Sequence, residues 1–113
     1  WSPLDGGLLG RNALNPLNAS RTEGIKARLE SQRETLLAFE KFANDLGQPQ
    51  DVIALAWLLA QPAVTAPIIG PRTLDQLEEN LKAVELELGP AEMAELDRIF
   101  PGPGGDAPRA YAW

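Results

Sequence analysis

The stretch from Ala66 to Asn80 combines residue types that could bind an anion. Its sequence, APIIGPRTLDQLEEN, reads as a short apolar run, a turn containing Gly70, an arginine and the start of a helix. Unpaired N–H groups and partial positive charge at a helix N-terminus favour a phosphate, and the Arg72 guanidinium can bind one bidentately. The pattern predicts a phosphate site, although the same turn also precedes ordinary surface helices whose arginine is only solvated.

Two polar side chains of the same predicted helix, Gln76 and Asn80, are four residues apart and share one face, with Glu79 beside them. This face could bind the ribose and the edge of an adenine that lies along the helix. The alternative is two solvated residues and a Gln that only caps the helix, because Thr73 and Gln76 form a capping box. Spacing alone favours the second interpretation.

The first residues offer an aromatic surface for a ligand. Trp1, Ser2, Pro3 and Leu4 place an aromatic ring, a hydroxyl and a turn next to one another. A flat cofactor ring could stack on Trp1, although a Trp in the core is the alternative. The glycines that follow, Gly7 among them, would let this loop fold over a ligand or simply turn.

The chain has few side chains suited to catalysis or metal binding. It has no His and no Cys, and its single tyrosine is Tyr111, near the C-terminal end. Without imidazole or thiolate ligands, a transition-metal site would depend on carboxylates alone. The paired glutamates at positions 78/79 and 92/95 are typical of helix surfaces. We therefore assign no catalytic residue and no metal site to this sequence.

Length and composition limit the class of protein. A chain of 113 residues with a hydrophobic fraction of 44% suits one globular domain. The net charge of −6 argues against a nucleic-acid partner, because such a partner needs a basic surface. No apolar run approaches the about 18–20 residues of a membrane span, and the lack of Cys fits a cytoplasmic protein. The chain opens on Trp1 rather than Met, so we expect further chain before it.

Apolar periodicity predicts an alternation of helices and strands. A strand ends within residues 1–4, a helix runs from Thr22 or Glu23 to about Leu46, and Gly47 stops it. An apolar buried helix is expected at residues 49–60, and a strand of the parallel type at residues 64–69. An amphipathic helix at residues 74–88 and a terminal helix at residues 90–100 should follow. This α/β pattern has too few strands for a sheet of its own, so part of the fold is expected to lie outside the chain.

Three blocks of the sequence resemble the C-terminal part of aldo-keto reductases, most of all bacterial members related to the potassium-channel β-subunit branch. The blocks are WSPLDGGLLG, ALAWLLAQPAVTAPIIGPRTLDQLEENL and the terminal helix with its tail PGPGGDAPRAYAW. The family fold is a (β/α)8 barrel, a TIM barrel whose active site lies at the C-terminal ends of the strands.

The resemblance implies that this chain supplies the last two strands and their helices, an incomplete barrel when isolated. It assigns residues 1–22 to the end of strand seven and the cofactor loop, and residues 23–60 to the helical connection. Residues 64–88 would then be strand eight and helix eight, and residues 90–113 the terminal helix and tail.

The resemblance also implies a binding site for NADP(H). Trp1 corresponds to the aromatic residue that stacks on the nicotinamide. Other positions of the first loop correspond to residues that line the cofactor or cross its pyrophosphate: Ser2, Pro3, Leu4, Gly7 and Arg11. The turn that holds the 2′-phosphate and the helix that touches the adenine correspond to Gly70, Arg72, Gln76, Glu79 and Asn80.

We therefore expect the cofactor-binding part of an NADP(H)-dependent oxidoreductase that reduces aldehydes and ketones to alcohols by hydride transfer. Its partners would be a small carbonyl substrate and the remainder of the barrel. The family's catalytic Asp, Tyr, Lys and His belong to earlier strands, so the 113 residues alone are expected to be inactive. Two alternatives stay open: a non-catalytic nucleotide-binding or regulatory module, and a helical interaction protein whose segment 74–88 packs on a partner.

Overall fold

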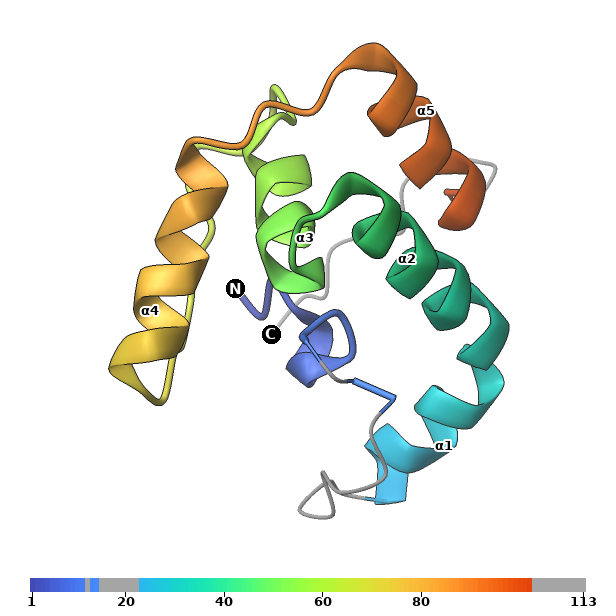
Figure 1. Cartoon of the computed structure of the whole chain (residues 1–113). Helices are drawn as coiled ribbons and strands as arrows, with labels where there is room; N and C mark the ends of the chain where they lie inside the picture. The colour runs from blue at the N-terminus through green and yellow to red at the C-terminus, as the bar shows by residue number, and fades with distance from the viewer. Residues whose placement is uncertain (12, 15–22, 103–113) are drawn as a thin grey trace.

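The computed structural model describes residues 1–11, 13–14 and 23–102, and in these residues the secondary structure is helical with no strand. A 3₁₀ turn, η1 (Asp5–Gly7), precedes the helices α1 (Glu23–Ser31), α2 (Arg33–Leu46) and α3 (Gln50–Leu59). The helix α4 (Leu74–Leu81), the 3₁₀ turn η2 (Lys82–Val84) and the helix α5 (Pro90–Ile99) follow. Figure 1 shows α4 flanking α3 on one side, with α2 next to both α3 and α5.

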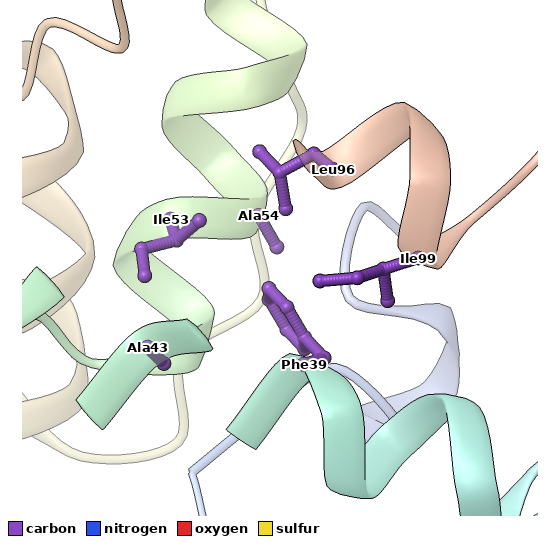
Figure 2. Packing of buried hydrophobic residues seen from close by; sticks show 6 residues of the cluster. All are labelled: Phe39, Ala43, Ile53, Ala54, Leu96 and Ile99. Atoms are coloured by element: carbon purple, nitrogen blue, oxygen red, sulfur yellow. The ribbon is translucent and has the colours of Figure 1, made fainter. Parts of the chain in front are cut away.

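The main apolar core lies where α2, α3 and α5 meet. Figure 2 shows side chains from all three helices converging there: Phe39, Ala43, Ile53, Ala54, Leu96 and Ile99. Phe39 is 1% exposed, and its ring meets Phe100 edge to face, with centroids 5.3 Å apart and an interplanar angle of 74°. This core holds α3 in place, and α3 in turn supports the flank on which α4 lies.

A second apolar cluster attaches the α4 region to α3. Three α3 side chains pack against Ala83 of η2: Val52, Leu55 and Ala56. Leu4 and Ile69 pack against the same cluster. The cluster therefore brings the first turn of the chain close to the segment that precedes α4.

Several predicted helix boundaries are confirmed. Gly47 ends α2 in the left-handed conformation with φ 67°, where its N–H donates to the carbonyls of Ala43 and Asn44. Pro49 is the N-cap of α3, and residues 52–56 are buried as the apolar pattern of residues 52–60 predicts, whereas Leu59 is exposed. The terminal helix begins at Pro90 as predicted, with its inward face buried.

The single helix predicted up to Leu46 is wrong, because two helices occupy that range. Gln32, with φ −109° and ψ 12°, leaves the helical conformation between α1 and α2. Apolar periodicity continues across this break, which is why the sequence pattern did not reveal it. The predicted start at Thr22 and the tail from residue 103 lie outside the described residues.

Neither predicted strand forms in the described part of the chain. Residues 64–69 have no strand pairing, and residues 1–4 form a turn in which Ser2 has φ 52°. A strand needs a neighbour to receive its backbone hydrogen bonds, and Pro67 has no N–H to donate. Residues 64–69 were predicted to be a strand because they form a short apolar run, but an apolar run cannot supply the partner strand that it needs.

The amphipathic helix predicted for residues 74–88 is shorter than expected. It ends at Leu81, continues as one 3₁₀ turn, and residues 86–89 lie outside any helix. The apolar stripe was expected to pack on a sheet, yet Leu74, Leu81 and Val84 are 68%, 55% and 73% exposed. In the described structure the face turned to α3 carries Asn80 and Ala83 instead, because no sheet is present to cover the leucines.

Candidate functional site

The turn before α4 is held by two hydrogen bonds between its own residues. The Gln76 N–H donates to Thr73 Oγ1 at 3.2 Å, which confirms Thr73 as the N-cap. The Arg72 N–H donates to Gln76 Oε1 at 2.8 Å. The Gln76 side chain therefore fixes the backbone at the helix start, as the capping-box alternative predicts, although it accepts from the Arg72 N–H rather than from the Thr73 N–H.

Arg72 and Gly70 lie on the outside of this turn. The residue Arg72 is exposed, so the guanidinium is accessible to a ligand. A Cβ built on Gly70 would meet no atom within 4 Å, and Gly70 does not have positive φ. Neither the packing nor the backbone of the described residues requires glycine here, so the open side of Gly70 is available for close approach by another group.

An ion pair joins the first loop to α4. The Arg11 guanidinium contacts Glu79 Oε1, and Lys82 Nζ lies 3.8 Å from the same oxygen. The family resemblance assigned Arg11 and Glu79, which lie in two segments far apart in sequence, to one binding site. Their contact places the two segments side by side.

Two polar residues of the adjacent helices α4 and α3, Asn80 and Asp51, are buried. They are 7% and 8% exposed, so the expectation of an accessible Asn80 amide is not met in the described structure. Burial is the largest influence on the Asp51 carboxyl and raises its pKa above the ordinary value. The Asp51 N–H lowers this pKa, the negative charge of Glu79 raises it, and Arg11 and the Val52 N–H lower it. The net change in the pKa is upward.

The first residues line a shallow depression of about 490 Å³. Trp1, Ser2 and Pro3 form one side, and residues 63–67 form much of the other. The Trp1 side chain is 82% exposed, whereas Leu4 turns inward to the apolar clusters. The structure thus places the predicted ring-stacking residue at an open surface, with polar groups beside it.

Gly7 supports the loop that follows. Its φ of 93° is a conformation that side chains rarely adopt, so glycine is required here by the backbone. Nearby, the Arg28 guanidinium of α1 binds the Asp5 carboxylate of η1 and holds the loop against that helix. The loop that carries Arg11 therefore has a defined shape at its beginning.

A separate apolar cavity of about 260 Å³ lies between the first loop and the main core. Phe39, Trp57 and Phe100 contribute aromatic walls, and Asp97 is its charged lining residue. None of the predicted polar ligand-binding residues faces it, and Pro3 alone among the predicted site residues lines it. This cavity is continuous with the core and offers little polar specificity.

The structure brings the predicted residues together in two groups. One group lies at the turn and face of α4 with Arg11, and the other at the open depression by Trp1. Asp51 was missed, although a signal existed: it is a charged residue at the start of a helix that is otherwise apolar on all sides. In residues 1–11, 13–14 and 23–102 no cluster of His, Cys, Asp and Glu is suited to a metal, and no helix there has the length and apolar character needed to cross a membrane.

Known proteins with similar sequences identify a common family. The family model described as "Aldo/keto reductase family" matches residues 1–100. The uncharacterized oxidoreductase YrpG of Bacillus subtilis is 49% identical over 113 residues, which cover 100% of this chain and 35% of that protein.

Two further relatives carry more specific descriptions. A putative voltage-gated potassium channel subunit beta of Schizosaccharomyces pombe is 32% identical over 88% of this chain and 33% of its own length. An aryl-alcohol dehydrogenase [NADP(+)] of Phanerodontia chrysosporium is 32% identical over 89% of this chain and 29% of its own length. The chain thus spans about one third of the length of these curated relatives.

Proposed function

The chain belongs to the aldo/keto reductase family, and we propose that it forms the cofactor-binding part of an NADP(H)-dependent oxidoreductase. The reaction is the reduction of aldehydes or ketones to alcohols. The bound NADPH supplies the hydride, and the residues of this chain hold the cofactor and orient it. The remainder of a (β/α)8 barrel supplies the carbonyl-binding pocket and the catalytic side chains.

The observation that carries this proposal is the contact between Arg11 and Glu79. The cofactor is long, with a phosphorylated adenosine at one end and the nicotinamide at the other. A site for it must draw on separate segments, and the ion pair puts the first loop beside the face of α4. The relative whose printed name includes NADP(+) supports the choice of cofactor.

The residues around the α4 turn fit the phosphorylated end of this cofactor. An exposed guanidinium on Arg72, an open approach at Gly70 and a capped helix N-terminus suit a phosphate dianion. Gln76 then acts by fixing the Arg72 backbone rather than by reaching the ligand itself. The buried Asn80 fits less well and would have to become accessible for its amide to bind adenine.

The nicotinamide end rests on Trp1 in this proposal. Its exposed ring stands beside Ser2 at the open depression, where residues 63–67 lie opposite. We propose that residues 1–4 and 64–69 become neighbouring strands when the other barrel strands pair with them. Their shared packing against the second apolar cluster, through Leu4 and Ile69, supports that arrangement.

Exchange of Arg72 for Ala tests the proposed 2′-phosphate contact. A hydrogen bond to a charged group contributes about 1.5–3 kcal/mol, so the NADPH dissociation constant should rise about tenfold or more. Binding of NADH, which lacks that phosphate, should change by less than about threefold. Tryptophan fluorescence measures both titrations, and Arg33→Ala, an exposed arginine on α2, is the matched control. Equal weakening of both nucleotides by Arg72→Ala would refute the role.

A second function is favoured by one feature of the sequence. The chain has no His and a single tyrosine, Tyr111, and by the resemblance the family's catalytic Asp, Tyr, Lys and His belong to earlier strands. A non-catalytic nucleotide-binding or regulatory module would need none of these catalytic residues. The reading frame before Trp1 distinguishes the two functions: an enzyme requires the family's Asp, Tyr, Lys and His there, and a binding module does not.

A further inference from the structure

Asp51 is a buried carboxyl group for which the proposed function has not yet accounted. It lies in the first turn of α3 and is 8% exposed. Among the described residues, its Oδ1 is a buried side-chain oxygen without a hydrogen-bond partner. A carboxylate that only stabilised the helix N-terminus would gain from water exposure, whereas this one bears the cost of burial.

The charged groups that act on Asp51 belong to the proposed cofactor site. The charges of Glu79 on α4 and of Arg11 in the first loop raise and lower the pKa of the Asp51 carboxyl, and these two residues form the ion pair described above. Lys82 of η2 lies 3.8 Å from the shared Glu79 oxygen. On the side of α2, Lys41 and Asp45 pair with each other and are not among the groups that perturb Asp51.

We propose that Asp51 is a positioning residue that controls how firmly Arg11 is held at the α4 face, and that its proton is thereby linked to nucleotide binding. The proposal rests on the proposed function, and it assigns to that same site a form of regulation. Asp51 does not touch the ligand and acts through Arg11 and Glu79.

The direction of the linkage follows from the local charges. With Asp51 protonated, Arg11, Glu79 and Lys82 carry a net charge of about +1, which favours an anionic nucleotide. With Asp51 ionised the sum is about zero, and a second carboxylate competes with the ligand for the Arg11 guanidinium. Nucleotide affinity should therefore decrease as the pH rises through the pKa of Asp51, which burial places above the ordinary value.

The variant Asp51→Asn mimics the protonated state at every pH. At acid pH we expect it to bind NADP⁺ as tightly as the wild type does. At neutral pH we expect it to bind about fivefold more tightly than the wild type, a factor near the lower limit of typical coupling between two sites. Calorimetry from about pH 4 to about pH 8 measures the NADP⁺ dissociation constants of both proteins, and the ratio of the wild-type constant to the variant constant is followed against pH. Ionisation of the ligand itself cancels in this ratio.

The matched control is Glu34→Gln, which removes an acidic group from the first turn of α2, outside the proposed site. The ratio of the wild-type NADP⁺ dissociation constant to that of Glu34→Gln should stay near one at all pH values. A merely structural role of Asp51 would shift the affinity equally at every pH, so a flat ratio for Asp51→Asn would overturn the proposal.

A second variant keeps the proposal testable if Asp51→Asn does not fold. Arg11→Gln leaves Asp51 in place but removes the group through which it acts. Calorimetry in two buffers of different ionisation enthalpy should show more proton uptake on nucleotide binding by the wild type than by Arg11→Gln, because protonation of the ligand's own phosphate contributes to both. Equal proton uptake by both proteins would overturn the proposal.

Failure of this proposal is distinguishable from failure of the proposed function. If the wild type binds NADP⁺ and the Asp51→Asn ratio is independent of pH, the linkage alone is wrong. If neither the wild type nor any variant binds NADP⁺ or NADPH at any pH, the cofactor role is wrong, and the linkage is overturned with it.

Discussion

Exchange of Phe39 for Ala should be among the most destabilising substitutions in this chain. The Phe39 side chain is 1% exposed and lies at the junction of α2, α3 and α5 (Figure 2). Truncation of a buried Phe to Ala costs about 3–5 kcal/mol, because the apolar transfer energy is lost and a cavity remains. Of this, about 0.5–1.5 kcal/mol should come from the edge-to-face contact with Phe100.

Urea titration followed by circular dichroism measures the free energy of unfolding. The matched control is Leu37→Ala on the same helix, where the side chain is 44% exposed. It should cost no more than about 1 kcal/mol, since roughly half of the leucine surface already contacts water. The slope of the unfolding free energy against urea concentration should be similar for both variants if their unfolded states are alike.

A double-mutant cycle isolates the ring contact. Phe100→Leu and the combined variant with Phe39→Leu should show a coupling energy of about 0.5–1.5 kcal/mol, because leucine keeps apolar volume but has no ring edge. A cost of Phe39→Ala no larger than that of Leu37→Ala would refute the position of the core. A coupling energy near zero would refute the ring contact while leaving the core intact.

Two further predictions concern helix ends. Thr73→Ala removes the oxygen that accepts from the Gln76 N–H, and it should cost about 1 kcal/mol of unfolding free energy, whereas Thr73→Ser should restore most of it; an unchanged midpoint in urea would contradict the cap. Gly47→Ala places a Cβ in open space but at φ 67°, so it should cost about 1 kcal/mol through backbone strain alone. Gly70→Ala is its control, because Gly70 lacks positive φ and its Cβ meets nothing, and a similar loss in both variants would contradict this explanation.

Local signals predicted three of the helix ends, but not the break at Gln32 or the end of α4 at Leu81. The Gly47 stop, the Thr73 cap and the Pro90 start all depend on interactions between residues close in sequence, and each is found in the structure. Such interactions do not require distant chain segments, which is why the pattern of residues suffices. The family was equally readable, because the blocks that carry it are contiguous.

The candidate site was only partly predictable. The sequence indicated Arg11 and Glu79 as members of one site, but their direct contact depends on how the first loop meets α4. The resemblance assigned Gln76 to the ligand and the capping-box spacing assigned it to the helix start; its amide oxygen accepts the Arg72 N–H, which lies nearer to the second role. The Arg11–Glu79 contact joins segments far apart in sequence, so spacing could not give it.

What the sequence determined by itself is the positions of helix caps, the apolar character of α3 and the family. Each of these is encoded in neighbouring residues or in contiguous blocks. Tertiary structure alone decided that residues 64–69 do not pair as a strand, that Leu74 and Leu81 of α4 face outward, and that Asp51 is buried. These outcomes depend on which segments are present to cover a face, to receive a hydrogen bond or to exclude water, and no local pattern contains that information.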